Sequence, residues 1–174
     1  MPRLAAGALA GRARAEGATL VGVVGYSRPL DPASIPAVDA ALQAALEACA
    51  AAAGGPIYVV SGATDAGVPG RAHALARRLG LVSVGFTARA ALAWPLAPLD
   101  LLVLAGQRFG DESAAFVRTC DAFVVLGGGP QSTHEIAAAR AAGKPVTAIQ
   151  GLGGAADALA EGPGVTLRAL RASR

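Results

Sequence analysis

The stretch Leu126-Gly-Gly-Gly-Pro-Gln-Ser-Thr-His-Glu135 leads from an apolar run into a helical pattern, and it indicates the fold. The run before it, residues 122–126, is continuously apolar, which is typical of a strand buried on both faces of a sheet. The pattern after it, residues 131–142, reads as a helix that Gly143 ends. A buried strand, a glycine-rich turn and a helix in this order predict one unit of a parallel α/β sheet.

The same alternation of apolar runs and helical patterns extends along the rest of the chain. Apolar runs predict six strands, at residues 19–24, 56–60, 81–86, 100–105, 122–126 and 145–149. Helical patterns lie between or after them, at residues 36–53, 71–79, 111–119, 131–142 and 155–161. Helices between strands imply right-handed crossovers and a mainly parallel sheet. The predicted fold class is therefore α/β, a single Rossmann-like doubly wound domain with a sheet of about six strands.

Length and composition are those of one globular domain. The chain has 174 residues, of which 53% are hydrophobic and 16% are charged. We divide it into an N-terminal arm at residues 1–17, read as flexible or as a short helix, the Rossmann-like domain at 18–165, and a C-terminal tail at 166–174. Two cysteines, Cys49 and Cys120, are too few for a disulfide framework, and we expect both to be small core residues.

Charge and hydropathy argue against several classes of partner. The formal net charge is +3, no run of five basic residues occurs, and aromatic residues make up 4% of the chain, so we expect no nucleic-acid partner. Prolines and an aspartate interrupt the most apolar stretch, residues 90–106, and residues 38–53 contain two acidic residues. Neither offers the ~20 apolar residues of a membrane span. Residues 1–17 lack the apolar core of a secretion signal, and we expect a cytoplasmic protein without a membrane partner.

The glycine-rich turn at residues 127–129 has the properties of an anion site. Glycine allows positive φ values and a close approach of the backbone to a ligand, and the helix that follows presents unpaired N–H groups and a positive dipole end. The alternative is a tight strand-to-helix turn in which Ser132 or Thr133 is a plain cap. The expected phosphate-binding residues are Gly127, Gly128, Gly129, Gln131, Ser132 and Thr133.

Two further turns follow predicted strands and should meet the first one, because ligands of such sheets bind beyond the carboxyl ends of the strands. The turn after the second strand contains Gly62, Gly67 and Gly70. A bound nucleotide could approach the backbone closely at these glycines. Packing of helix against strand would explain the same glycines. Ser27 and Arg28 follow the first strand, and we expect them to contact ribose or phosphate.

The sequence contains no strong motif for other kinds of nucleotide, catalytic or metal site. The chain has neither a Walker loop nor a G-x-G-x-x-G fingerprint after its first strand. His134 could be a donor at the edge of the site, and we expect His73 to be solvated. Ser132 and His134 diverge by about 200° on a helix, which argues against a serine nucleophile. The histidines share no metal spacing with the cysteines, so we expect no metal site.

The two glycine turns, in this order, resemble those of the LONELY GUY (LOG)-like proteins, within the SLOG group of Rossmann-like nucleotide binders. Their motif G-G-G-x-x-G-L-M-G is matched by Gly62, Gly67, Val68 and Gly70. Their signature P-G-G-x-G-T-x-x-E is matched by Gly128, Gly129 and Glu135, with Ser132 in place of threonine. The resemblance covers residues 19–149.

The resemblance implies a site for a nucleoside 5′-monophosphate, with no other cofactor required, in a homodimer or higher homo-oligomer. In catalytic members it implies hydrolysis of the N-glycosidic bond, which releases the base and ribose 5-phosphate. Positive charge develops at the anomeric carbon during such a cleavage, and Glu135 would stabilise it. The alternative for Glu135 is an acidic first-turn residue that favours the helix dipole.

Three departures from the family pattern leave the activity open. Gly127 replaces the signature proline, Gln131 replaces the inner glycine, and Glu112 stands where catalytic members carry an arginine. Arg108 could reach the site from its loop and replace that arginine as a catalytic residue. If Arg108 faces solvent, the resemblance favours a binding protein on the same scaffold, such as a nucleotide sensor or a molybdenum-cofactor carrier, whose ligand also bears a phosphate. A purely structural protein would have no pocket at these turns.

Overall fold

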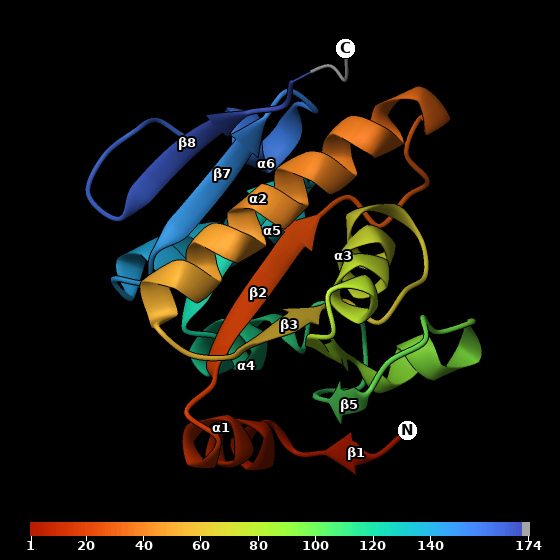
Figure 1. Ribbon diagram of the computed structural model, residues 1–174. Helices are drawn as coiled ribbons and strands as arrows, with labels where there is room; N and C mark the ends of the chain where they lie inside the picture. Colours follow the sequence, from red (N-terminus) through yellow and green to blue (C-terminus); the bar gives the residue numbers. More distant parts are fainter. Residues whose placement is uncertain (172–174) are drawn as a thin grey trace.

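A parallel β-sheet is the middle layer of the protein in the computed structural model, which describes residues 1–171 (Figure 1). Over those residues the sheet has eight strands in the order β1-β5-β4-β3-β2-β6-β7-β8, and all neighbouring strands run parallel. The strands are β1 (Arg3–Leu4), β2 (Thr19–Gly25), β3 (Ile57–Ser61), β4 (Val82–Thr87), β5 (Leu101–Leu104), β6 (Ala122–Leu126), β7 (Val146–Gln150) and β8 (Val165–Ala169). The predicted Rossmann-like α/β fold with a parallel sheet is confirmed.

Helices cover both faces of this sheet, as Figure 1 shows with α2 and α3 in front and α5 and α6 behind. One face packs against α2 (Ile35–Ala53) and α3 (Gly67–Arg78). The other packs against α1 (Ala6–Ala15), α4 (Ser113–Thr119), α5 (Pro130–Ala141) and α6 (Gly154–Asp157). Short 3-10 turns occupy Pro32–Ser34 and Arg89–Ala93. Because helices cover both faces, the central strands are apolar throughout, and all five residues of β3 are buried.

Helix α2 is apolar enough, by length and composition alone, to be a candidate membrane span over residues 32–53. Its apolar residues Val38, Leu42, Ala45 and Leu46 are fully buried against the sheet. Their spacing of three to four residues places them on one side of the helix. We therefore describe α2 as a helix of the core layer, which ends at Gly54 in the left-handed conformation.

The two ends of the chain contain more regular structure than the expected arm and tail, and α1 agrees with the short helix given as the alternative for residues 1–17. Residues 1–17 form β1 and α1, whose Leu9 and Ala13 are buried, and β1 pairs with β5. In the expected tail, β8 pairs with β7 and adds a second edge strand. A two-residue strand has no hydrophobic period, and β8 has only one buried residue, Val165, so neither produced a recognisable pattern. The last part of the tail, residues 172–174, lies outside the described residues.

The direction of the sheet connections reverses between β2 and β6. From β2 the chain continues through α2 to β3 on one side, whereas β6 lies on the other side of β2 and continues through α5 to β7. A crevice opens at such a switch point, because the turns at the carboxyl ends of the two strands leave in opposite directions. The turns after β2 and β6 are two of those that the sequence singles out.

Candidate functional site

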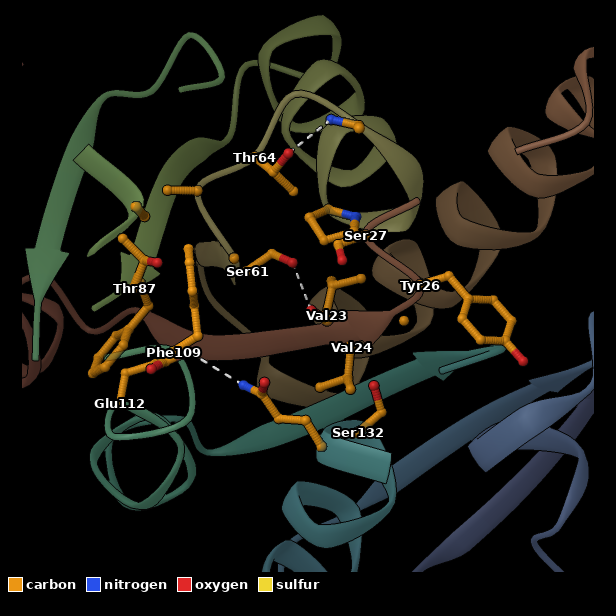
Figure 2. Close-up of a pocket in the computed structure, with 18 of the residues that line it drawn as sticks. Val23, Val24, Tyr26, Ser27, Ser61, Thr64, Thr87, Phe109, Glu112 and Ser132 are labelled. Atoms are coloured by element: carbon orange, nitrogen blue, oxygen red, sulfur yellow. Dashed lines mark hydrogen bonds between the residues drawn. The ribbon is translucent and has the colours of Figure 1, made fainter. Parts of the chain in front are cut away.

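A cleft of about 870 Å³ lies at the carboxyl ends of β2, β3 and β4 and beside the first turns of α4 and α5. Its lining includes residues 23–28 after β2, residues 61–66 after β3, and residues 129–132 at the start of α5. Figure 2 shows Thr87, Phe109 and Glu112 at one end of the view and Tyr26 at the other, with Ser132 between them. Parts of the three predicted turns therefore meet at one cleft, although Gly127 and Gly128 are not among the residues that line it.

The turn after β6 requires glycine at two positions. Gly127 has a φ of 64° and Gly128 a φ of 102°, both in the region that favours glycine. A Cβ on Gly127 would lie 2.6 Å from the ring of Tyr26, and one on Gly128 would lie 2.6 Å from the Cβ of Ser132. The turn thus combines a positive-φ backbone with close packing.

The hydrogen bonds of this turn leave its donors free. The carbonyls of Gly127 and Gly128 accept from the amides of Ala156 and Ala155 at the start of α6, at 3.0 and 2.9 Å, and the carbonyl of Gly129 accepts from the amide of Thr133 at 3.0 Å. Within residues 1–171, no protein acceptor takes the amides of Gly128, Gly129, Gln131 and Ser132. These four N–H groups surround the positive end of α5.

The three residues after Gln131 divide between the cleft and a second hollow. Ser132 is buried and lines the cleft, whereas Thr133 and His134 are exposed and line a shallow hollow on the other side of Gly129. The hydroxyl of Thr133 donates to the carbonyl of Gly129 at 3.2 Å. His134 therefore lies at the edge of the turn and outside the cleft.

The three glycines of the turn after β3 divide into two groups. Gly62 lines the cleft, while Gly67 and Gly70 are buried outside it. A Cβ on Gly67 would overlap the carbonyl oxygen of Tyr26, and one on Gly70 would overlap that of Asp65. Close packing between the start of α3 and its neighbours therefore accounts for Gly67 and Gly70.

His73 is buried, contrary to the expectation that it would be solvated. Its Nε2–H donates to the carbonyl of Gly62 at 2.7 Å, and its Nδ1 accepts from the hydroxyl of Ser83 at 2.9 Å. Burial lowers the pKa of His73, which favours this neutral form. The burial of His73 could not be predicted from the sequence, because it depends on which face of α3 packs against the sheet. His73 holds the Gly62 end of the turn in place.

The turn after β2 contributes one cation to the cleft. Ser27 and Arg28, which we expect to contact a ligand, are exposed and line the cleft. The Arg28 guanidinium lies 4.4 Å from the centroid of the Tyr26 ring, a cation–π distance. Tyr26 in turn packs against Gly127 and Gly154, so Arg28 lies near the glycine turn.

Arg108, the residue expected to replace the family's arginine, does not reach the cleft. It is exposed and is not among the residues that line the cleft. Its backbone amide donates to the carboxylate of Asp111 at 2.9 Å, which holds the loop there. The structure therefore does not bring Arg108 to Glu135.

Glu135 instead meets a second carboxylate, that of Glu112. Glu135 Oε1 accepts from the Ser113 hydroxyl at 2.6 Å and from Gln131 Nε2 at 3.1 Å. The same Gln131 amide donates to Glu112 Oε1 at 3.2 Å, and Glu112 Oε2 accepts from the amide of Gly110 at 2.8 Å. Gln131 thus bridges two acidic side chains from α5 and the turn before α4.

Burial raises the pKa of Glu135, and the nearby Glu112 adds to this, while hydrogen bonds from Ser113 and Gln131 act in the opposite direction. At pH values between the ordinary glutamate pKa and this raised pKa, Glu135 is therefore protonated more often in the folded protein than in the unfolded chain. The free energy of unfolding falls as pH rises through that interval, and the full penalty is present above it.

Replacing Glu135 by glutamine should therefore raise the melting temperature at about pH 8 and lose this advantage at about pH 4. Each pKa unit of the difference corresponds to about 1.4 kcal/mol. The glutamine carbonyl still accepts from Ser113 and Gln131. Differential scanning fluorimetry measures both variants across pH, with the exposed Glu161→Gln as the control. A gain of equal size at both pH values would contradict the argument.

Aromatic side chains form the outer wall of the cleft. Trp94 is 68% exposed and Phe109 60% exposed, yet both line it. Their segments are joined because the amides of Arg89 and Ala90 donate to the carbonyls of Gly106 and Gln107, at 3.2 and 3.0 Å. No local motif in the sequence indicates this wall, since each aromatic residue stands alone in a loop.

Solved structures with the same fold extend over most of the chain. TM1055 has a TM-score of 0.62 and 24% identity, covering 87% of this chain and 91% of its own. The molybdenum cofactor binding protein of Rippkaea orientalis has a TM-score of 0.59 and 20% identity, covering 75% and 76%. The molybdenum cofactor carrier protein of Chlamydomonas reinhardtii has a TM-score of 0.53 and 20% identity, with the same coverage. At these identities the similarity shows the fold alone.

The family comparison is more specific. No curated protein matches the chain. A model of the SLOG cluster4 family, however, matches residues 18–168, which span the sheet from β2 to β8 and all three turns. The SLOG resemblance of the glycine turns is thereby confirmed, and the chain belongs to the SLOG cluster4 family.

Proposed function

We propose that this protein binds a nucleoside 5′-monophosphate, or a similar phosphate ester, in the cleft beside the start of α5. The observation that carries the proposal is the group of free main-chain amides at Gly128, Gly129, Gln131 and Ser132. Amides at a helix N-terminus suit a phosphate, because they donate hydrogen bonds and the helix dipole favours negative charge.

The surroundings of the amides support the same ligand class. Arg28 lies near the glycine turn and can pair with a phosphate from its exposed position. The volume of about 870 Å³ lies within the range of small-molecule sites, about 300–1,000 Å³. The aromatic wall formed by Trp94 and Phe109 offers flat apolar surfaces to the rest of the ligand. Gly62, Ser27 and Ser132 complete the proposed contacts, and the ligand needs no further cofactor.

Binding without hydrolysis is the activity we propose, as in a carrier or a sensor. A hydrolase of the LOG kind uses an arginine at the position of Glu112, and Arg108 faces solvent rather than the cleft. Two of the solved structures with this fold are named for binding or carrying the molybdenum cofactor. That cofactor is also a phosphate ester, and it is one candidate ligand.

Hydrolysis of the N-glycosidic bond is the second candidate, and Glu135 favours it. Glu135 lies in the cleft one helical turn from the free amides, and hydrolysis would require the anomeric carbon of the bound nucleotide, rather than its ring edge, to lie beside it. Its raised pKa suits a group that donates a proton to a departing base. Both candidates share the phosphate site and differ in turnover.

A single experiment separates the two candidates. Four nucleoside 5′-monophosphates and ribose 5-phosphate are titrated by calorimetry, and free base is followed by chromatography over hours. We expect binding without base release, and we expect Arg108→Ala to bind like the wild type because Arg108 is not among the residues that line the cleft. Base release that disappears in Glu135→Gln would establish the hydrolase instead. Failure of every compound to bind would reject the phosphate site.

Assembly and location complete the proposal. We propose a cytoplasmic homo-oligomer that binds small molecules and does not bind nucleic acid or membranes. The resemblance to LOG-like proteins supports the assembly. The small net charge of +3 argues against binding of nucleic acid. Light scattering after size-exclusion chromatography measures the assembly.

A further inference from the structure

The cleft holds two buried acidic side chains that a phosphate site does not require. Glu112 and Glu135 are each 7% exposed and both line the cleft. No ion pair among residues 1–171 involves either of them. Their hydrogen-bond donors are neutral groups, namely the Ser113 hydroxyl, the Gln131 amide and the Gly110 backbone.

Such an arrangement is unfavourable in the free protein. Burying a carboxylate without a cation carries a desolvation cost that neutral hydrogen bonds offset only in part. Two carboxylates joined through one Gln131 amide also repel each other, and a bound phosphate adds further negative charge to the same cleft. Groups of this kind are typical of functional sites, where a ligand supplies the missing partner.

We infer that Glu112 and Glu135 select a ligand whose flat ring presents a ring N–H beside an exocyclic amino group. This inference rests on the proposed function and specifies its ligand class. A carboxylate accepts two parallel N–H donors from such an edge, much as it does from an arginine side chain. Guanine and pterin rings carry the edge, whereas adenine presents an acceptor nitrogen next to its amino group.

The acceptors that this edge needs are available. Glu135 Oε2 accepts no hydrogen bond from any described residue, although the side chain is more than nine-tenths buried and lines the cleft. Each oxygen of a carboxylate has two lone pairs, so Glu112 can also accept further donors. The carboxamide oxygen of Gln131 likewise accepts nothing among residues 1–171.

The position of the acidic pair fits the ring end of a nucleotide. Phe109 and Glu112 belong to the same turn before α4, and Figure 2 shows them together, away from Tyr26. The exposed rings of Phe109 and Trp94 line the cleft wall and can stack on a flat ring. With the phosphate on the amides of Gly129 and Ser132, the ring would extend toward Glu112.

The test compares phosphate esters that differ in the ring edge. GMP, IMP, AMP, ribose 5-phosphate and 6-hydroxymethylpterin phosphate are titrated against the full chain by calorimetry. The chain has one tryptophan, Trp94, so fluorescence quenching gives a second readout. We expect GMP to bind about 10- to 100-fold more tightly than AMP, with IMP between them because it lacks the amino group. Whichever of GMP and the pterin ester binds more tightly shows whether the preferred ring is guanine or pterin.

Two variants connect the preference to the acidic pair. Glu112→Gln and Glu135→Gln should each reduce the ratio of GMP to AMP affinity about tenfold, because a neutral acceptor binds N–H donors less strongly than a carboxylate. Glu161→Gln is the matched control, since Glu161 is exposed and is not among the residues that line the cleft. Melting curves confirm that each variant is folded.

The outcomes separate this inference from the proposed function. Equal affinity for GMP and AMP, alongside clear binding of ribose 5-phosphate, would overturn the ring preference and leave the phosphate site standing. An affinity for all nucleotides that depends on added Mg²⁺ and on both glutamates would also overturn it, because the pair would then bind a cation. Failure of every ester to bind would reject both proposals.

Discussion

Replacing Gly129 with aspartate is expected to abolish nucleotide binding and, at the same time, to raise the melting temperature. Gly129 is the N-cap of α5, its φ of −92° and ψ of −161° are extended, and no side chain among the described residues caps this helix. A Cβ at Gly129 would meet nothing within 4 Å. The new carboxylate would accept from the amides of Gln131 or Ser132 and stabilise the helix by about 0.5–1 kcal/mol.

The same carboxylate would occupy the amides proposed for the phosphate and repel the phosphate itself. Affinity for ribose 5-phosphate and GMP should fall by about 100-fold or more. Gly162→Asp is the matched control, because Gly162 also has open space around its Cβ and lies before β8, outside the cleft lining. Calorimetry and scanning fluorimetry measure the two effects. Wild-type affinity in Gly129→Asp would show that the phosphate binds elsewhere.

Replacing Gly67 with alanine is expected to cause the largest loss of stability among the glycine variants of the site. Gly67 has a φ of 61°, which costs a non-glycine residue about 1–2 kcal/mol. A Cβ there would also overlap the carbonyl oxygens of Tyr26 and Arg28, at about 2.6 Å from the latter. Backbone atoms cannot rotate away as a side chain can, so the turn after β2 would have to move. We expect a total loss of at least about 3 kcal/mol.

Gly80→Ala separates the two causes of this loss. Gly80 has a φ of 69°, almost the same as that of Gly67, but its Cβ would meet nothing within 4 Å. This variant should therefore lose only the backbone strain energy of about 1–2 kcal/mol. Urea unfolding of both variants gives the comparison. Equal losses would mean that the contact between Gly67 and the turn after β2 adds nothing.

Most of the fold could be predicted from the sequence, because burial on both faces makes each central strand a continuous apolar run. Residues 122–126 are an example, and they form β6 with the predicted bounds. The edge strands could not be predicted, since β1 has two residues and β8 has only one buried residue. The strand conformation of β1 depends on pairing with β5, which lies far away in the sequence. That of β8 depends on pairing with β7, from which α6 and its flanking loops separate it.

The glycine-rich turn after β6 was predictable for a similar reason. Positive φ at Gly127 and Gly128 and free amides at a helix start are local properties, and glycine, proline and the helical pattern signal them directly. The position of Arg108 was not predictable, because a loop residue can point either way. Nor was the role of Gln131, which the sequence presents only as a departure from a family pattern.

By itself, the sequence determined the α/β class, the three turns and the SLOG family, because hydrophobic period and glycine placement act over a few residues. Only the tertiary structure decided that Glu112 and Glu135 meet without a cation, that Arg108 stays outside, and that His73 is buried. Those outcomes depend on how α3, α4 and α5 pack on the sheet. Packing joins distant side chains, and no local pattern records which of them will meet.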